Sequence, residues 1–95
     1  MEKTTRLRKA VGGAKVPFKF DVKACEFLIK NLTDGSIYVT FSVDVTDIEK
    51  MILIPQGAYQ RYTVRDGECN LASTDTVYVA GENSGEGVEI ECLKW

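Results

Sequence analysis

Apolar and polar side chains alternate over most of the chain, which is the period-two pattern of half-buried β-strands. The clearest alternation covers residues 16–22, 25–29 and 37–43, where every second side chain is apolar. No stretch of the chain shows the period of about 3.6 residues that marks an amphipathic helix. Shorter segments with strand character lie at residues 51–54, 58–64, 68–71, 76–80 and 88–92.

Glycine, proline, asparagine and aspartate separate these segments and favour tight turns. Residues 31–35 and 55–57 have turn composition, and residues 81–87 hold three glycines, which predicts an exposed loop. Thr46 and Glu49 have the spacing of a capping box, which allows a single helical turn between two strands. Seven or eight short strands joined in this way predict an all-β fold, namely a seven- to eight-stranded antiparallel β-sandwich.

The phase of the alternation assigns the interior face of the sandwich. Apolar side chains at alternate positions point to the same face of a strand, so they are expected to be buried together. Pro17 cannot donate a ladder hydrogen bond, which places its strand at the edge of a sheet. The side chains predicted to form the core are Phe27, Ile37, Val39, Phe41, Val77, Val79 and Ile90.

The N-terminal residues differ from the rest of the chain in charge. Residues 1–15 carry five basic side chains and one acidic side chain, whereas the remaining residues carry seven basic and thirteen acidic ones. Residues 1–13 contain few large apolar side chains and end in two glycines, so they are predicted to form a flexible basic N-terminal arm. Residues 14–95 are predicted to form a single β-sandwich domain.

The basic arm suits contact with the acidic body of a neighbouring copy, because opposite charges favour association. Deleting residues 1–11 is therefore expected to leave the domain folded and to weaken association. An acidic body argues against nucleic-acid binding by the domain face, since phosphates are neutralised by clustered lysine and arginine. The same basic charges leave nucleic-acid binding by the arm as the rival interpretation.

The residue types on which most enzyme sites depend are scarce. The chain has no histidine, which removes the usual general base and the commonest metal ligand. Loop carboxylates offer a calcium site as one alternative, with Asp44, Asp47 and Glu49 in one connection and Glu82 and Glu86 in another. They lack the spacing of an EF-hand and are interpreted as solvated charge. The sequence thus predicts no catalytic residue, no cofactor and no metal.

Three cysteines, Cys25, Cys69 and Cys92, lie in or beside apolar segments. An odd number without CxxC spacing predicts buried free thiols in a reducing compartment rather than a disulfide framework. The first twenty residues lack the apolar segment of a secretory signal, and no stretch reaches the ~18 apolar residues of a membrane span. We therefore expect neither export nor a membrane partner.

Exposed tyrosine and tryptophan side chains are preferred contacts at protein interfaces and for stacking on sugars. Tyr38 and Tyr78 fall on the polar faces of their strands, which makes them candidates for such contacts. The alternative is that the aromatic side chains cover the open ends of a thin sandwich. The candidate interface residues are Arg6, Arg8, Lys9, Tyr38, Tyr59, Tyr78 and Trp95.

Four segments carry a resemblance to a known group of proteins. They are Ala24–Val39 (ACEFLIKNLTDGSIYV), the turn Ile54–Gly57 (IPQG), Val77–Val79 (VYV) and the C-terminal Val88–Trp95 (VEIECLKW). In these segments the chain resembles small virion proteins of tailed phages and prophages of Gram-positive bacteria. The likeness consists of strand and turn patterning, so it transfers no functional residue.

The resemblance implies a jelly-roll-like sandwich placed on the head of the particle or at its surface. It also implies a virion location after assembly in the bacterial cytoplasm, with copies of itself and other virion proteins as partners. A non-enzymatic structural protein is the leading hypothesis. The alternatives are a carbohydrate- or receptor-binding module and a host-encoded regulatory or adaptor domain.

Overall fold

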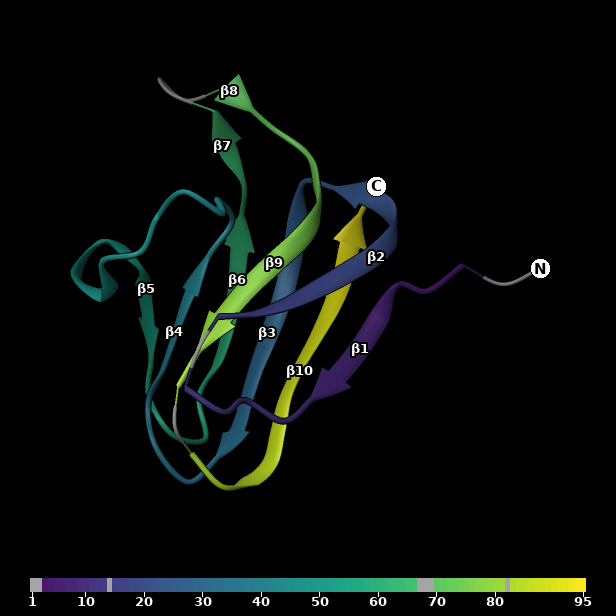
Figure 1. Ribbon diagram of the computed structural model, residues 1–95. Helices are drawn as coiled ribbons and strands as arrows, with labels where there is room; N and C mark the ends of the chain where they lie inside the picture. Colours follow the sequence, from purple (N-terminus) through teal and green to yellow (C-terminus); the bar gives the residue numbers. More distant parts are fainter. Residues whose placement is uncertain (1–2, 14, 67–69, 82) are drawn as a thin grey trace.

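A computed structural model describes residues 3–13, 15–66, 70–81 and 83–95 of the chain (Figure 1). Within these residues the strands form two four-stranded antiparallel sheets and one two-stranded antiparallel sheet. The elements are β1 (Arg6–Lys9), β2 (Val16–Ala24), β3 (Glu26–Thr33), β4 (Ile37–Thr40), the 3-10 turn η1 (Ile48–Lys50), β5 (Ile52–Ile54), β6 (Tyr59–Thr63), β7 (Arg65–Asp66), β8 (Asn70–Leu71), β9 (Thr74–Ala80) and β10 (Gly85–Lys94).

The two large sheets have the strand order of a jelly roll. One sheet, here called sheet A, runs β1-β10-β3-β6, and the other, sheet B, runs β2-β9-β4-β5. Four antiparallel pairs nest inside one another along the chain: β4 with β5, β3 with β6, β2 with β9, and β1 with β10. Rolling such a nested hairpin into two facing sheets produces the two Greek keys of a jelly roll. The predicted seven- to eight-stranded, jelly-roll-like antiparallel sandwich is therefore confirmed.

The core lies between the sheets and follows the predicted phase of alternation. In β2 the apolar side chains Phe18, Phe20 and Val22 are buried, while the charged side chains between them are exposed. Their facing side chains come from sheet A and complete one continuous apolar cluster. The predicted core residues that are buried are Phe27, Ile37, Val39, Val77, Val79 and Ile90.

Phe41 is the exception among the predicted core residues, because β4 ends one residue before it. The Thr40 hydroxyl accepts a hydrogen bond from the Ser42 amide at 3.2 Å, and the chain turns away from the sheet there. The Phe41 ring is half-buried, with its centroid 5.6 Å from that of Phe27 and 5.1 Å from that of Tyr62. Phe41 thus covers the margin of the core, and the predicted strand over residues 37–43 is wrong beyond Thr40.

The structure also differs from the predicted flexible arm at residues 1–13. Arg6–Lys9 form β1, an edge strand that lies against β10 (Figure 1), and Val11 is 5% exposed within the core. The Cys92 amide donates to the carbonyl of Thr5 at 2.8 Å. The segment is ordered by a ladder and by one buried valine, although it is too polar to fold alone. The predicted boundary between arm and domain therefore does not hold for this segment.

A glycine in β10 makes room for the end of β1. Gly87 has φ +89°, a backbone conformation that side-chain-bearing residues rarely adopt. A Cβ atom at Gly87 would collide with the carbonyl oxygen of Lys9. The close approach of the two backbones at the end of the β1–β10 ladder therefore requires glycine at this position.

The predicted turn at residues 31–35 begins later than expected, because β3 continues to Thr33. Asn31 is fully buried, and its amide nitrogen lies 2.8 to 3.0 Å from the carbonyl oxygens of Gly35, Ile54 and Pro55. Its side-chain oxygen accepts from both the amide and the hydroxyl of Thr33. This amide ties the β3–β4 turn to the end of β5 and leaves no side-chain atom of Asn31 unsatisfied.

The single helical turn is present between β4 and β5, with a different capping residue from the one predicted. Asp47 caps η1, since its carboxylate accepts from the amide of Glu49 at 3.0 Å, in place of Thr46. The connection projects beyond the edge strand β5 (Figure 1). Over the described residues, no helix has the length and apolar character that crossing a membrane requires.

Candidate functional site

An open groove of about 460 Å³ lies on the outer face of sheet B. Tyr38 lines it from the centre of β4, where its neighbours Ile37 and Val39 point into the core. Ile48 of η1 forms another wall, and Asn83 contributes from the loop before β10. The groove is thus lined by residues of β4 and β9 and by connections that are distant from one another in sequence.

Hydrogen bonds between loops shape the polar rim of this groove. The side-chain Nδ2 of Asn83 donates to the carbonyl of Ser36 at 2.6 Å. The main-chain amide of Gly13 donates to the carbonyl of Gly81 at 2.6 Å. The lining residues that the structure describes include no carboxylate, amine or thiol. They offer an aromatic ring, hydroxyl groups and amide groups, which can stack on a small polar molecule or form hydrogen bonds with it.

The connection over residues 41–51 is fastened to the outer face of sheet B by Lys15. The Lys15 Nζ donates to the carbonyls of Val43 and Val45 at 2.6 and 3.0 Å. The same ammonium lies 5.6 Å from the ring centroid of Tyr78, which is a cation–π distance. Tyr78, predicted as an interface residue, is therefore half-buried beneath a lysine of its own chain.

The outer face of sheet A carries rows of alternating charge. One row runs from Arg8 through Glu89 and Lys30 to Tyr59, in the register of β1, β10, β3 and β6. The Lys30 Nζ lies 3.1 Å from the Glu89 carboxylate and 5.5 Å from the Tyr59 ring centroid. The hydrogen bond from Lys30 lowers the pKa of Glu89, and the nearby charges of Lys30, Arg6 and Arg8 lower it further.

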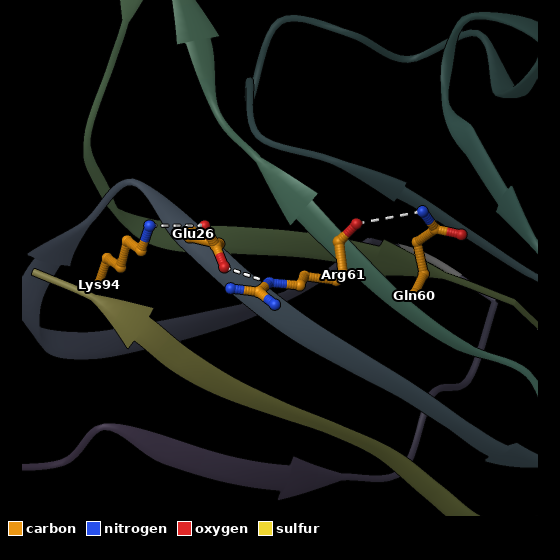
Figure 2. Close-up of polar contacts among 4 residues, drawn as sticks. All are labelled: Glu26, Gln60, Arg61 and Lys94. Carbon is orange, nitrogen blue, oxygen red and sulfur yellow. Dashed lines mark hydrogen bonds and ion pairs between the residues drawn. The ribbon is translucent and has the colours of Figure 1, made fainter.

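Among the described residues, Glu26 is the one charged side chain that is buried on this face. Its carboxylate forms ion pairs with two cationic side chains. Figure 2 shows its carboxylate between Arg61 of β6 and Lys94 of β10. Arg61 Nε donates to one oxygen, and Lys94 Nζ lies 3.6 Å from the other. The hydrogen bond from Arg61 is the main cause that lowers the pKa of Glu26, so this carboxylate stays ionised at neutral pH.

The predicted interface residues do not gather into one site. Tyr38 and Tyr78 lie on the outer face of sheet B, whereas Arg6, Arg8 and Tyr59 lie on the outer face of sheet A. Tyr59 and Trp95 are the most exposed of the predicted aromatic residues, at 61% and 66%.

Lys9 differs from the other predicted interface residues, because its ammonium turns back to its own chain. The Lys9 Nζ donates to the carbonyl of Pro17 at 2.8 Å and lies 5.5 Å from the Phe18 ring centroid. Lys9 therefore helps to hold β1 against β2 rather than reaching outward.

Sequence reasoning missed three exposed apolar side chains close together in the chain. Val43 and Ile48 lie in the connection after β4, and Leu53 lies in β5. Leu53 had a signal in the sequence, because it stands between Ile52 and Ile54, where alternation calls for a polar residue. Val43 had none, since it continued an apparently regular strand pattern.

Among the residues that the structure describes, no three cysteine or carboxylate side chains gather as metal ligands would. Asp47, one of the loop carboxylates considered for calcium, is used as the cap of η1. Glu86 lies 3.5 Å from Arg8 across the β1–β10 pair. Glu82 lies outside the described residues.

The structure describes two of the three cysteines that were predicted to be free thiols, and both are free. Cys25 is half-buried and Cys92 is buried, and neither forms a disulfide. Burial raises the pKa of the Cys92 thiol to about 11, and the charge of Glu91 adds to the effect. A thiol in this state is a weak nucleophile at neutral pH. Cys69 lies outside the described residues.

No protein-family model, curated protein or solved structure matches this chain. Its fold and its surfaces are therefore the basis for a functional conclusion. They offer the jelly-roll strand order, an uncharged groove on sheet B, a charged outer face on sheet A and exposed apolar side chains near β5.

Proposed function

We propose that the chain is a non-enzymatic structural protein of a phage or prophage virion, acting by self-association and by docking on the particle. The observation that carries the proposal is the jelly-roll order of the two sheets. Jelly rolls are the architecture of many viral capsid domains, in which copies pack closely side by side. This step is an analogy of fold, and the same architecture also serves lectins and cupins.

The surfaces of the molecule support association over catalysis. Val43, Ile48 and Leu53 leave large apolar side chains in water within eleven residues of chain, and burial of these side chains against a partner would be favourable. Metal-dependent cupin chemistry relies on histidine ligands, and this chain has no histidine. Copies of the chain and other virion proteins are the proposed partners, and the virion, assembled in the bacterial cytoplasm, is the proposed location.

The test of this function is the protein content of purified particles. Particles induced from a lysogen that carries the gene should contain the chain in a fixed ratio to the major capsid protein, as measured by quantitative mass spectrometry. Flanking capsid, portal or tail genes would agree with that result. A chain that is abundant in the cell lysate and absent from the particles would contradict the proposal.

A carbohydrate- or receptor-binding module is the second candidate, and the groove on sheet B favours it. Tyr38 supplies an aromatic surface for a sugar ring, and the Asn83 side chain lies at the rim. A glycan array followed by NMR titration measures this directly. Tyr38→Ala should abolish shifts caused by a true ligand, whereas Tyr59→Ala on the opposite sheet should leave them unchanged.

A further inference from the structure

β6 ends sheet A and presents an open edge. The strand order places β3 on one side of it, and no other strand in the described part of the chain pairs with it. Three of its residues, Tyr59, Gln60 and Arg61, are exposed. An edge of this kind offers unpaired main-chain groups to another strand.

The hydrogen bonds to β3 fix which main-chain groups of β6 face outward. The Asn31 amide donates to the carbonyl of Ala58 at 3.0 Å, and the Val64 amide donates to the carbonyl of Cys25 at 2.8 Å. In an antiparallel ladder the direction of these groups alternates with each residue. The even-numbered residues of β6 therefore bond to β3, and the amides and carbonyls of Tyr59, Arg61 and Thr63 point to the open edge.

One outward carbonyl is capped within the chain itself. Figure 2 shows the Gln60 side chain turned toward the carbonyl of Arg61, to which its Nε2 donates at 3.2 Å. This contact is long and links adjacent residues on an exposed surface, so a strand amide can replace it at little cost. The edge is thus covered at this one carbonyl by a side chain that a partner strand can displace.

The sequence of β6 favours one register for pairing with a second copy. Placing Arg61 opposite Arg61 of the second copy sets two like charges side by side, which destabilises a strand pair. A shift by two residues instead places Tyr59 of each copy opposite Arg61 of the other. Each of these two pairs then exchanges two main-chain hydrogen bonds, and each guanidinium lies beside an aromatic ring.

We propose that two copies of this chain associate through antiparallel pairing of their β6 edges, with Tyr59 of each copy opposite Arg61 of the other. The pairing is two-fold symmetric and joins the two A sheets into one continuous eight-stranded sheet. This inference rests on the proposed self-association and specifies the surface that performs it. The Tyr59 amide replaces Gln60 as the donor to the partner's Arg61 carbonyl.

Proline substitutions at outward-facing positions test the pairing and its register. Tyr59→Pro removes two of the four proposed intermolecular hydrogen bonds and leaves the ladder to β3 intact, because the lost amide faces outward. Thr63→Pro is the matched control, since it removes an outward amide that the proposed register does not use. Light scattering should give a dimer for the unmodified chain and for Thr63→Pro, with dimerisation at least about tenfold weaker for Tyr59→Pro.

Each other outcome has a distinct meaning. Equal weakening by both prolines overturns the register, because the rejected alignment pairs Tyr59 with Thr63. Association that neither proline changes overturns the edge pairing and leaves the proposed self-association standing. An unmodified chain that is monomeric throughout overturns the edge pairing together with the self-association on which it rests.

Amide hydrogen exchange of the unmodified chain tests the pairing without relying on a variant that has to fold. Raising the protein concentration should protect the amides of Tyr59 and Arg61, and dilution should remove that protection. The amide of Thr63 should exchange at the same rate at both concentrations. Protection that does not depend on concentration at Tyr59 and Arg61 would overturn the inference.

Discussion

Arg8 lies opposite Glu89 in the register of β1 and β10, and its guanidinium also lies 3.5 Å from the Glu86 carboxylate. The basic N-terminal segment thus meets the acidic strand of its own chain. Part of the charge asymmetry of the sequence is thus paired within one molecule. Association is therefore expected to depend on strand edges and apolar side chains more than on this segment.

Deletion of residues 1–11 should destabilise the domain, in contrast to the expectation from sequence. The deletion removes β1 and the buried Val11, and it exposes the edge of β10. Burial of a valine side chain contributes about 1.5–3 kcal/mol, so urea denaturation should give a loss of at least about 2 kcal/mol. The double variant with Arg6→Gln and Arg8→Gln is the control and should lose less, because exposed ion pairs contribute little. Unchanged stability of the deletion variant would contradict the docking of β1.

Gly87→Val should release β1 from the edge of sheet A. The new Cβ atom would collide with the Lys9 carbonyl, and the positive φ is strained for valine. We expect trypsin to cleave after Arg8 and Lys9 of the folded variant much faster than in the unmodified chain. Gly12→Ala is the control, because open space surrounds that position. Equal cleavage rates for Gly87→Val and the unmodified chain would refute this role of Gly87.

Asn31→Asp should be strongly destabilising although the two side chains have the same shape. The carboxylate cannot donate to the carbonyls of Gly35, Ile54 and Pro55, and its charge would be buried among them. A loss of roughly 2–4 kcal/mol is expected at neutral pH, with a smaller loss near pH 4, where the carboxyl is protonated. Thermal unfolding at the two pH values measures the difference. A loss that does not vary with pH would argue against a buried charge as the cause.

The carboxylates with lowered pKa values predict a loss of stability in acid. Glu26 has a folded-state pKa below its ordinary value of 4.5, chiefly because Arg61 donates to it. Its contribution to stability is therefore present above that ordinary value and is lost as the pH falls through the folded-state pKa. Arg61→Met should move the acid unfolding midpoint, followed by circular dichroism, to higher pH. Lys23→Met, on the exposed side of β2, is the control. Equal shifts in both variants would show a general charge effect.

The alternation of side chains was sufficient to predict strands whose two faces differ in environment. β2 is such a strand, because Phe18, Phe20 and Val22 face the core and charged residues face water. β1 could not be predicted in this way, since its short segment contains Leu7 among three basic side chains. Its order depends on pairing with β10 and on the space at Gly87, and both are tertiary features.

The candidate surfaces were predicted less completely than the fold. Tyr38 and Tyr78 were placed on the outward faces of their strands correctly, because strand parity alone decides the face of a side chain. The part that Asn83 plays in the groove could not be foreseen, since the jelly-roll topology brings its loop beside Ser36 from a distant part of the chain. The open edge of β6 likewise follows from the order of strands in sheet A, and the alternation of side chains along a strand does not determine that order.

Sedimentation equilibrium of the unmodified chain tests the proposed self-association most directly. Concentrations from about 1 μM to about 1 mM cover association free energies of roughly −8 to −4 kcal/mol. The account predicts a mean mass that rises with concentration from that of one 95-residue chain to at least twice that value. A single mass equal to one chain at every concentration, at low and at high salt, would contradict it.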